Sequence, residues 1–447
     1  MSVELPVELW NRVLELLPRR SLLVLRTVSS FFSDLSSPCL YREFKTWPSI
    51  YATQGGTSSP TRRELVRLAF WSSDKVAPHV RTCQVRYTGD IVLQGTSPFV
   101  NALFDTISHF SNLRSLSCTF NGYRIELPAL RVENLLHLQK LHIHGGPLSR
   151  PDEQPTSFKI SVRRFGYTDI FIPYPGDGPP RFSCLSLLDP DTLRSLELGA
   201  GHPLGLTHFL TDKATMASFH NLRALSITFA ESDFNHIHAF VVSFPAIEDL
   251  ILDLRQPCTP GPDADFASLS TLTPLAPHLR RYKGPVALLP LVLRGSHPTH
   301  LTLTQRGGSA TELLQTLLRT RCDTKSVSSL AIRVALHADI CADPALLELL
   351  ALFPRLTRLA IHVSSDRTGT LELSEPHTAS HEHISDRLAH ILTVPPALQT
   401  AVFRWRLART QDAEILPSVA QLTARTHVIN PGLEVSFSRL SADPWGF

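Results

Sequence analysis

The stretch NLRSLSC, residues 112–118, decides the fold, because its pattern of apolar residues returns along most of the chain. Close copies read HLQKLHI at 137, TLRSLEL at 192 and NLRALSI at 221. Further copies are HVRTCQV at 79, AIEDLIL at 246, HLRRYKG at 278, SVSSLAI at 326, RLTRLAI at 355 and ALQTAVF at 397, with PTHLTLT at 298 as a weaker copy. Most copies begin 25 to 33 residues after the one before. The double interval between 137 and 192 predicts a degenerate copy near FKISVRRF.

An LxxLxL strand with a period of this length is the signature of a leucine-rich-repeat solenoid. Several copies follow a helical segment that ends in an aromatic residue, namely Phe110, Phe219, Phe244 or Phe353. Each such unit can bury its apolar face only against its neighbours. A doubly wound α/β domain also alternates strand and helix, but it does not repeat one strand pattern so often.

Strand alternation predicts which residues meet a partner. The leucines point into the core, and the residues between them face the other, concave side. The middle and late copies place acidic residues first and basic residues later on that side, which could orient a charged partner. Exposed strand positions are commonly polar in any case. The candidate target-binding residues are Glu197, Asp249, Asp253, Arg333, Arg358, His362, Arg404 and Arg406.

The composition excludes several classes of protein. A formal net charge of +3 over 447 residues, with no run of five basic residues, does not indicate nucleic-acid binding. Seven cysteines form no CxxC pair and indicate reduced thiols, so we expect a cytoplasmic or nuclear protein. The N-terminus does not resemble a signal peptide, and no apolar run is long enough to span a membrane.

The first fifty residues differ from the repeats. Pro6 suits the first turn of a helix, and apolar residues then recur at helical spacing up to Leu17. Pro18 ends this helix, Ser21 is the expected N-cap of a second, and Pro38 is expected to open a third. Three short helices within this length form a marginal core that gains stability from a partner.

The segment LPVELWNRVLELLPRRSLLVLRTVSSFFSDLSSPCLYR, residues 5–42, resembles an F-box. It departs from the usual pattern at Trp10 and at Phe31 and Phe32. F-boxes dock onto the Skp-family adaptor of cullin–RING ubiquitin ligases. Alternatively, the helices are only the start of a larger helical core. The resemblance implies that the adaptor contact is made or supported by Leu5, Pro6, Leu9, Leu14, Leu17, Leu22, Leu25 and Val28.

Candidate chemical sites are weak. GAGHPLG at 199–205 has Leu204 where a dinucleotide-binding motif needs its third glycine. His142 and His144 share a strand face, and HTASHEHIS at 377–385 is not an HExxH motif, so neither indicates a metal site. We therefore expect no catalysis, no cofactor and no metal.

The sequence predicts an α/β chain with a small three-helix F-box at 1–48, a linker and helix at 49–78, a leucine-rich-repeat-like αβ solenoid at 79–440 and a tail at 441–447. The expected role is substrate recognition in a Skp–cullin–F-box ubiquitin ligase, with an unknown protein target and no nucleic-acid or membrane partner. The alternative is a protein-binding scaffold that does not cause degradation.

Overall fold

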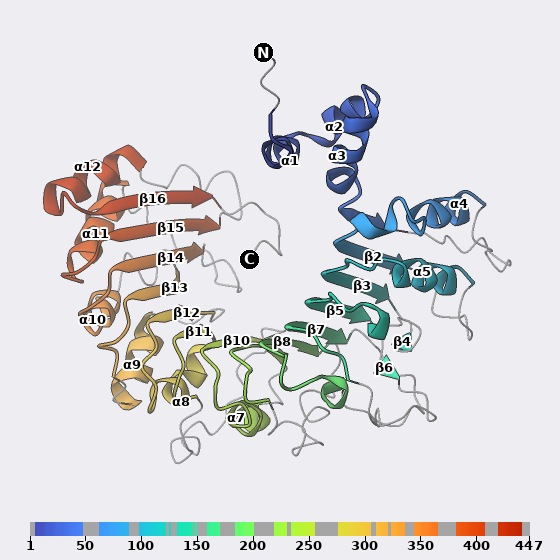
Figure 1. The fold of residues 1–447 in the computed structure, drawn as a ribbon. Coiled ribbons are helices and arrows are strands. Elements are labelled where there is room, and N and C mark those ends of the chain that lie inside the picture. The colour runs from blue at the N-terminus through green and yellow to red at the C-terminus, as the bar shows by residue number, and fades with distance from the viewer. Residues whose placement is uncertain are drawn as a thin grey trace, which may run out of the picture. The chain divides into compact units, whose positions relative to one another are not determined.

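A computed structural model describes residues 5–47, 62–88, 98–121, 125–126, 132–145, 148–149, 159–169, 184–200, 219–229, 234–254, 276–304, 310–320, 323–335, 344–364, 381–406 and 419–439. The chain divides into two compact units, Met1–Leu222 and Arg223–Phe447. Both are mixed α/β, with parallel strands and helices between them. Figure 1 shows the elements in chain order.

The first unit begins with three helices, α1 (Val7–Leu16), α2 (Arg19–Arg26) and α3 (Ser30–Leu40). Their number matches the prediction, but their bounds do not. Pro18, not Ser21, precedes the first residue of α2. The third helix starts eight residues before Pro38, because the Ser29 hydroxyl accepts a hydrogen bond from the Phe32 amide at 3.3 Å and caps it. Pro38 therefore lies inside α3, near its end.

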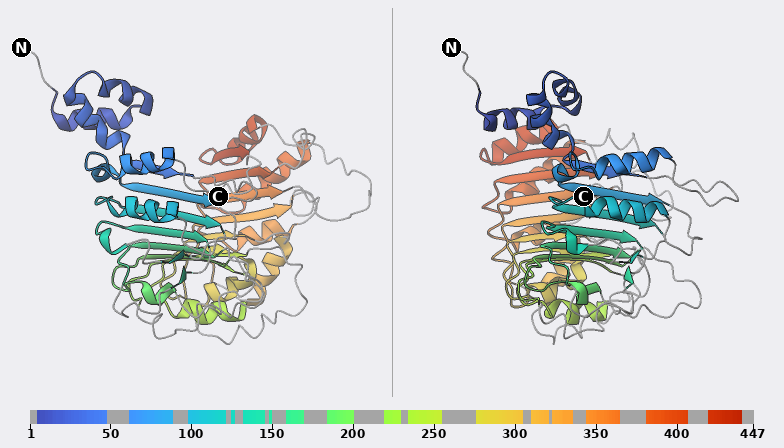
Figure 2. Two further views of the ribbon diagram at one scale, coloured as in Figure 1. Left: turned by 90° about the vertical axis from the view of Figure 1, so that its right-hand side faces the viewer. Right: turned by 45° about the vertical axis from the view of Figure 1, so that its right-hand side comes forward.

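Six of the described strands of the first unit form a parallel sheet whose order follows the chain, β1-β2-β3-β5-β7-β8. Helices α4 (Arg62–Trp71) and α5 (Pro98–Ser108) pack against each other beside β1–β3 (Figure 2). A separate two-stranded sheet pairs β4 (Ile125–Glu126) with β6 (Leu148–Ser149). The six strands are β1 (Glu43–Thr46), β2 (Thr82–Thr88), β3 (Ser115–Asn121), β5 (Lys140–Gly145), β7 (Arg164–Asp169) and β8 (Ser195–Ala200).

The second unit contains eight described strands, also parallel and also in chain order. They are β9 (Ala224–Phe229), β10 (Asp249–Leu254), β11 (Arg281–Gly284), β12 (His300–Leu303), β13 (Ser329–Ala335), β14 (Arg358–Ser364), β15 (Thr400–Arg406) and β16 (Glu434–Arg439). The helices between them are α7 (Phe234–Val242), α8 (Leu289–Leu293), α9 (Ala310–Thr320), α10 (Ala345–Ala351), α11 (His381–Thr393) and α12 (Val419–Ile429).

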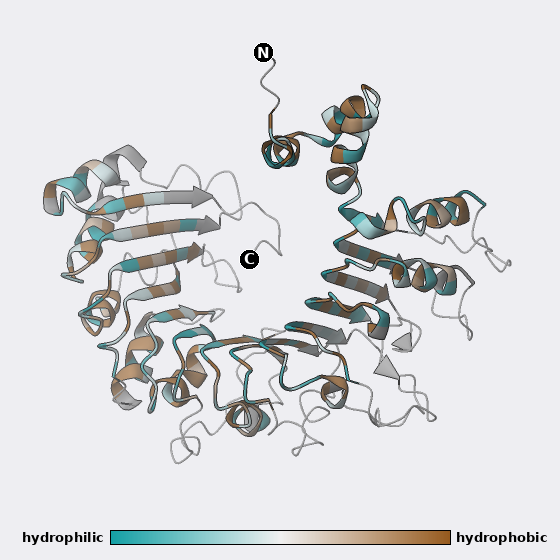
Figure 3. Cartoon of the chain, viewed as in Figure 1, coloured by the Kyte–Doolittle hydropathy of each residue, from teal (hydrophilic) through white to brown (hydrophobic). Residues whose placement is uncertain are grey.

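A strand begins within every predicted copy of the repeat motif, including the degenerate copy, where β7 begins at Arg164. Alternate strand residues are buried, as in β5, β9 and β12, which gives the strands the striped colouring of Figure 3. Apart from the short strands β4 and β6, two strands have no predicted motif. They are β1, inside the segment predicted as the F-box, and β16.

The aromatic residues before the motif have a structural role that repeats between copies. Phe110, Phe219, Phe244 and Phe353 are all fully buried or nearly so. Each carbonyl accepts a hydrogen bond from the amide three residues later, for example Leu113 to Phe110 at 3.0 Å and Leu356 to Phe353 at 3.1 Å. The pattern therefore forms a tight turn that leads into the next strand, with its aromatic side chain in the core.

Candidate functional site

The three N-terminal helices expose an unusual amount of apolar surface. Large apolar residues that are exposed number eighteen among the described residues, and nine of them fall between residues 5 and 31. We call these nine the helical apolar surface: Leu5, Val7, Leu9, Val13, Leu16, Leu23, Val24, Val28 and Phe31. Concentrated apolar exposure of this kind marks a binding site in soluble proteins.

The predicted adaptor-binding residues divide into two groups. Leu5, Pro6, Leu9 and Val28 are exposed, and Leu17 and Leu25 are half-buried, so these side chains can meet a partner. Leu14 and Leu22 are buried and hold the helices together, so they can support a contact but cannot make one. Six residues of this surface were not among the predicted adaptor-binding residues, although helical spacing could have placed them there: Val7, Val13, Leu16, Leu23, Val24 and Phe31.

Trp10 and Phe32, two residues that depart from the usual F-box pattern, contact each other. Their rings meet edge to face with centroids 5.2 Å apart, and both side chains are half-buried. This contact packs α1 against α3 in a geometry that aromatic pairs favour. Phe31 contacts Phe32 in the same way, with centroids 5.4 Å apart, but remains exposed. The unusual residues therefore enlarge a small core and add one ring to its surface.

A short connection joins these helices to the sheet. Only Tyr41 and Arg42 separate the end of α3 from β1. Tyr41 is buried, and its hydroxyl and ring both contact the Arg26 guanidinium. The Arg42 carbonyl accepts hydrogen bonds from the Arg81 and Thr82 amides, at 2.9 and 3.1 Å. Both connecting residues are thus held in place by neighbouring elements.

An aromatic cluster strengthens this junction. Trp71 of α4 meets both Tyr41 and Phe44 edge to face, with centroids 5.7 and 5.0 Å apart. Phe44 also meets Phe110, which closes the turn after α5, with centroids 5.5 Å apart. The three-helix segment is therefore continuous with the hydrophobic core of the first unit.

A second candidate site is the sheet face opposite the buried leucines, which we call the open face. Glu197 of β8 lies on it in the first unit and is exposed. The register places Gly166 of β7 between His142 and Glu197. A Cβ at Gly166 would lie 2.5 Å from His142 Nδ1, so the ring occupies space that the glycine leaves free, and its Nδ1 lies 3.9 Å from Glu197 Oε2. Glu197 thus has a partner within the chain.

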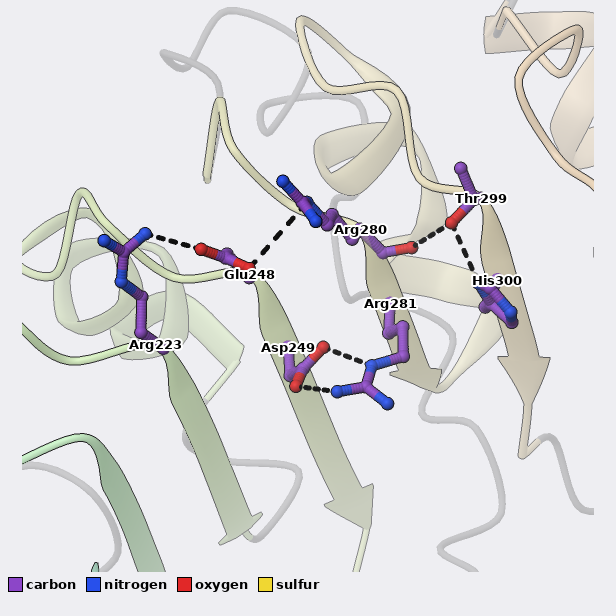
Figure 4. Close-up of polar contacts among 7 residues, drawn as sticks. All are labelled: Arg223, Glu248, Asp249, Arg280, Arg281, Thr299 and His300. Carbon is purple, nitrogen blue, oxygen red and sulfur yellow. Dashed lines mark hydrogen bonds and ion pairs between the residues drawn. The ribbon is translucent and has the colours of Figure 1, made fainter. Parts of the chain in front are cut away.

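Asp249 in the second unit also has an internal partner. Figure 4 shows both carboxylate oxygens accepting hydrogen bonds from the Arg281 guanidinium of the next strand. This bond raises the pKa of Arg281, as does the carboxylate charge. One residue earlier, Glu248 forms ion pairs with Arg223 and Arg280, the latter at 3.7 Å. Asp253 is exposed at the far end of β10.

Three predicted basic residues form one row across neighbouring strands. Arg333 of β13 pairs in register with His362 of β14, which pairs with Arg404 of β15. Burial, followed by the charges of Arg404, Arg333 and Lys283, lowers the pKa of His362 to about 4. At neutral pH this row therefore holds two cations on either side of an uncharged imidazole.

The remaining basic candidates lie at the ends of two strands that contribute to the open face. Arg358 is exposed at the start of β14, and Arg406 ends β15, where its backbone alone is described. Arg281 and Lys283 of β11 were not chosen from the sequence, although the alternation rule applied to RYKG identifies both. The second unit therefore carries more positive charge on this face than was predicted.

The described part of the chain offers neither a metal cluster nor a membrane-spanning helix. The described residues contain no group of three His, Cys, Asp or Glu side chains that could hold a metal ion. None of the described helices is both long and apolar enough to cross a bilayer. Most of GAGHPLG, and His377, lie outside the described residues. No protein-family model matches the sequence, and comparison with curated proteins finds no match.

Proposed function

We propose that this chain is the substrate-recognition subunit of a Skp–cullin–F-box ubiquitin ligase. In this proposal the helical apolar surface docks the Skp-family adaptor, and the open face of the sheets holds a target protein. The chain performs no bond chemistry and contributes proximity and orientation to ubiquitin transfer. The proposal also takes the parallel strands and their helices as a leucine-rich-repeat-like solenoid.

The observation that carries the proposal is the exposure of apolar residues within the segment that resembles an F-box. Leu9 is 46% exposed and Val28 is 63% exposed, although both belong to the pattern. A helical segment that only began a larger core would bury such residues. Their exposure beside the buried Leu14 and Leu22 suits a small module that keeps one face for a partner.

The strand order supports the solenoid part of the proposal. In the main sheet of each unit the strands follow one another in chain order, and every strand is parallel to its neighbour. A doubly wound sheet would instead reverse its order at a switch point. Stacked repeats produce the order seen here, because each repeat contacts the next one along the chain.

Docking can be tested with a matched pair of variants. Leu9→Ala with Val28→Ala removes exposed apolar groups from the helical apolar surface. Leu65→Ala with Val66→Ala makes the same changes on α4, where the two residues are 42% and 62% exposed. If Leu9 and Val28 are buried in the complex, their loss weakens adaptor binding about 100-fold or more, at about 0.8 kcal/mol per CH₂ group.

Calorimetry of the full chain with a purified Skp-family adaptor measures this effect. The wild type and the α4 variant should bind with equal affinity. The proposal fails if the wild type does not bind, or if the Leu9/Val28 variant binds as tightly as the wild type. Circular dichroism should show the same thermal transition for all three proteins, since none of these changes touches a buried side chain.

Degradation and scaffolding are separated by a second experiment. Proteins that co-purify with the full chain are identified, and their half-lives are compared in cells that express the wild type or the Leu9/Val28 variant. Longer half-lives with the variant support a ligase role. Equal half-lives, with adaptor binding lost, favour the scaffold that does not cause degradation.

A further inference from the structure

The strands β11 to β15 carry charge of one sign. Their sequences, RYKG, HLTL, SLAIRVA, RLAIHVS and TAVFRWR, contain six arginine or lysine residues, two histidines and no carboxylate. The register places all eight at alternate positions, and those whose side chains are described lie on the open face and not among the buried leucines. We call Lys283, Arg333, Arg358, His362 and Arg404 the basic face.

The register defines the layout of the basic face. Arg333, His362 and Arg404 form one row, and Arg358 lies four residues before His362 on the same strand. Two residues before this row, Ala331, Ala360 and Val402 pair in register, so their small side chains lie between the row and Arg358. Neighbouring strands are about 4.8 Å apart, so Arg333 and Arg404 are separated by about 10 Å, which three residues of an extended chain span.

The open face already contains an example of an arginine that binds a carboxylate. Asp249 of β10 accepts two hydrogen bonds from Arg281 of β11, in the fork geometry that arginine offers to a carboxylate. Beyond β11, none of the strands up to β15 has an acidic residue to repeat this arrangement. Burial is the main cause of the low pKa of His362, and the charges of Arg404, Arg333 and Lys283 lower it further, so these three cations lie near one imidazole.

We propose, building on the target-binding role above, that the basic face binds an extended acidic segment of a protein target. Glutamate or aspartate side chains would pair with Arg404 and Arg358, and the backbone would lie over the small residues between them. Neutral His362 can accept or donate a hydrogen bond there. Single-stranded nucleic acid fits less well, because its bases need aromatic platforms, and the rings on this face are the imidazoles of His300 and His362.

The test uses the full chain and a fluorescein-labelled hexaglutamate peptide, followed by fluorescence anisotropy. Arg358→Gln with Arg404→Gln removes two exposed charges from the basic face. Arg294→Gln with Arg355→Gln removes two exposed charges outside it and is the matched control. The first variant should bind at least about tenfold more weakly, which corresponds to about 1.4 kcal/mol, and the control should bind like the wild type.

Two further probes sharpen the result. Binding should weaken between about 0.1 M and 1 M salt, where the screening length falls from about 10 Å to about 3 Å. Hexaglutamine should not bind. The inference is overturned if the two double variants bind hexaglutamate equally, or if an oligothymidylate of the same charge binds as tightly as the peptide.

Adaptor binding, measured on the same samples, separates this inference from the proposed function. If the two double variants bind hexaglutamate equally while adaptor binding is normal, only the acidic-segment inference is overturned. Absence of adaptor binding by the wild type overturns the ligase proposal, whatever the peptide does. The Arg358/Arg404 variant should bind the adaptor normally, because neither residue belongs to the helical apolar surface.

Discussion

The low pKa of His362 gives a quantitative test of the row formed by Arg333, His362 and Arg404. We predict that Arg404→Gln raises this pKa from about 4 by about 0.5 to 1, because one of the flanking charges is removed. The value should stay below the ordinary 6.5, since burial is the largest cause and Arg333 and Lys283 remain. Arg404 is exposed, so the fold should tolerate the change.

The sign of the effect on stability follows from the two states. Between pH 6.5 and about 4 the unfolded chain protonates His362 while the folded chain does not, so folding stability falls as the pH falls. A pKa difference of this size corresponds to about 3 kcal/mol without screening. Because part of the His362 side chain meets solvent, we expect a loss of about 1 to 2 kcal/mol.

Histidine ring resonances in a ¹³C-labelled protein provide the assay. A His362→Gln variant identifies the resonance, and titration of the wild type and of Arg404→Gln gives the two pKa values. Arg294→Gln is the control and should leave the value at about 4. A wild-type pKa near 6.5 would refute the reasoning. A low pKa that does not respond to Arg404→Gln would show that burial alone causes it.

Three further predictions concern the core. Leu14→Ala should destabilise the three-helix segment by about 2 to 5 kcal/mol, because the side chain is fully buried, and limited proteolysis should then cleave residues 5–40 faster. Tyr282→Phe should cost about 1 to 2 kcal/mol in chemical denaturation, since the buried hydroxyl donates to the Pro285 carbonyl at 2.8 Å. Burial raises the pKa of Cys118 to about 12 and that of Cys83 well above 9, so mass spectrometry should find both unalkylated by iodoacetamide at about pH 8 until the chain unfolds.

The motif copies predicted the strands because each carries its own apolar alternation. The same approach missed β1, whose EFKT contains one large buried side chain, Phe44, and β16, which has no LxxLxL frame. Both strands lie at an end of the strand order and gain their stability by pairing with one neighbour. In β16, Val435 and Phe437 alternate with polar residues, so simple strand alternation, and not the LxxLxL frame, was the signal that could have identified it.

The candidate site was less predictable than the fold. Strand alternation predicted that Asp249 and Glu197 lie on the open face. It did not predict that Arg281 and His142, on other strands, lie beside them. Those pairs depend on register and on the space at Gly166, which a single repeat does not contain. Helical spacing likewise predicted apolar stripes at the N-terminus without showing that Leu14 is covered while Leu9 is open to solvent.

The two-residue connection between α3 and β1 has a consequence for how the chain could hold two partners at once. A flexible tether lets its ends search a volume, and its reach sets their effective concentration. Tyr41 and Arg42 are too few for this, and both are held by other elements. The N-terminal helices and the first sheet should therefore move as one rigid body. The orientation of a bound target, and not the length of a linker, then determines what that target can approach. A glycine–serine insertion after Arg42 would make this connection flexible without changing either surface.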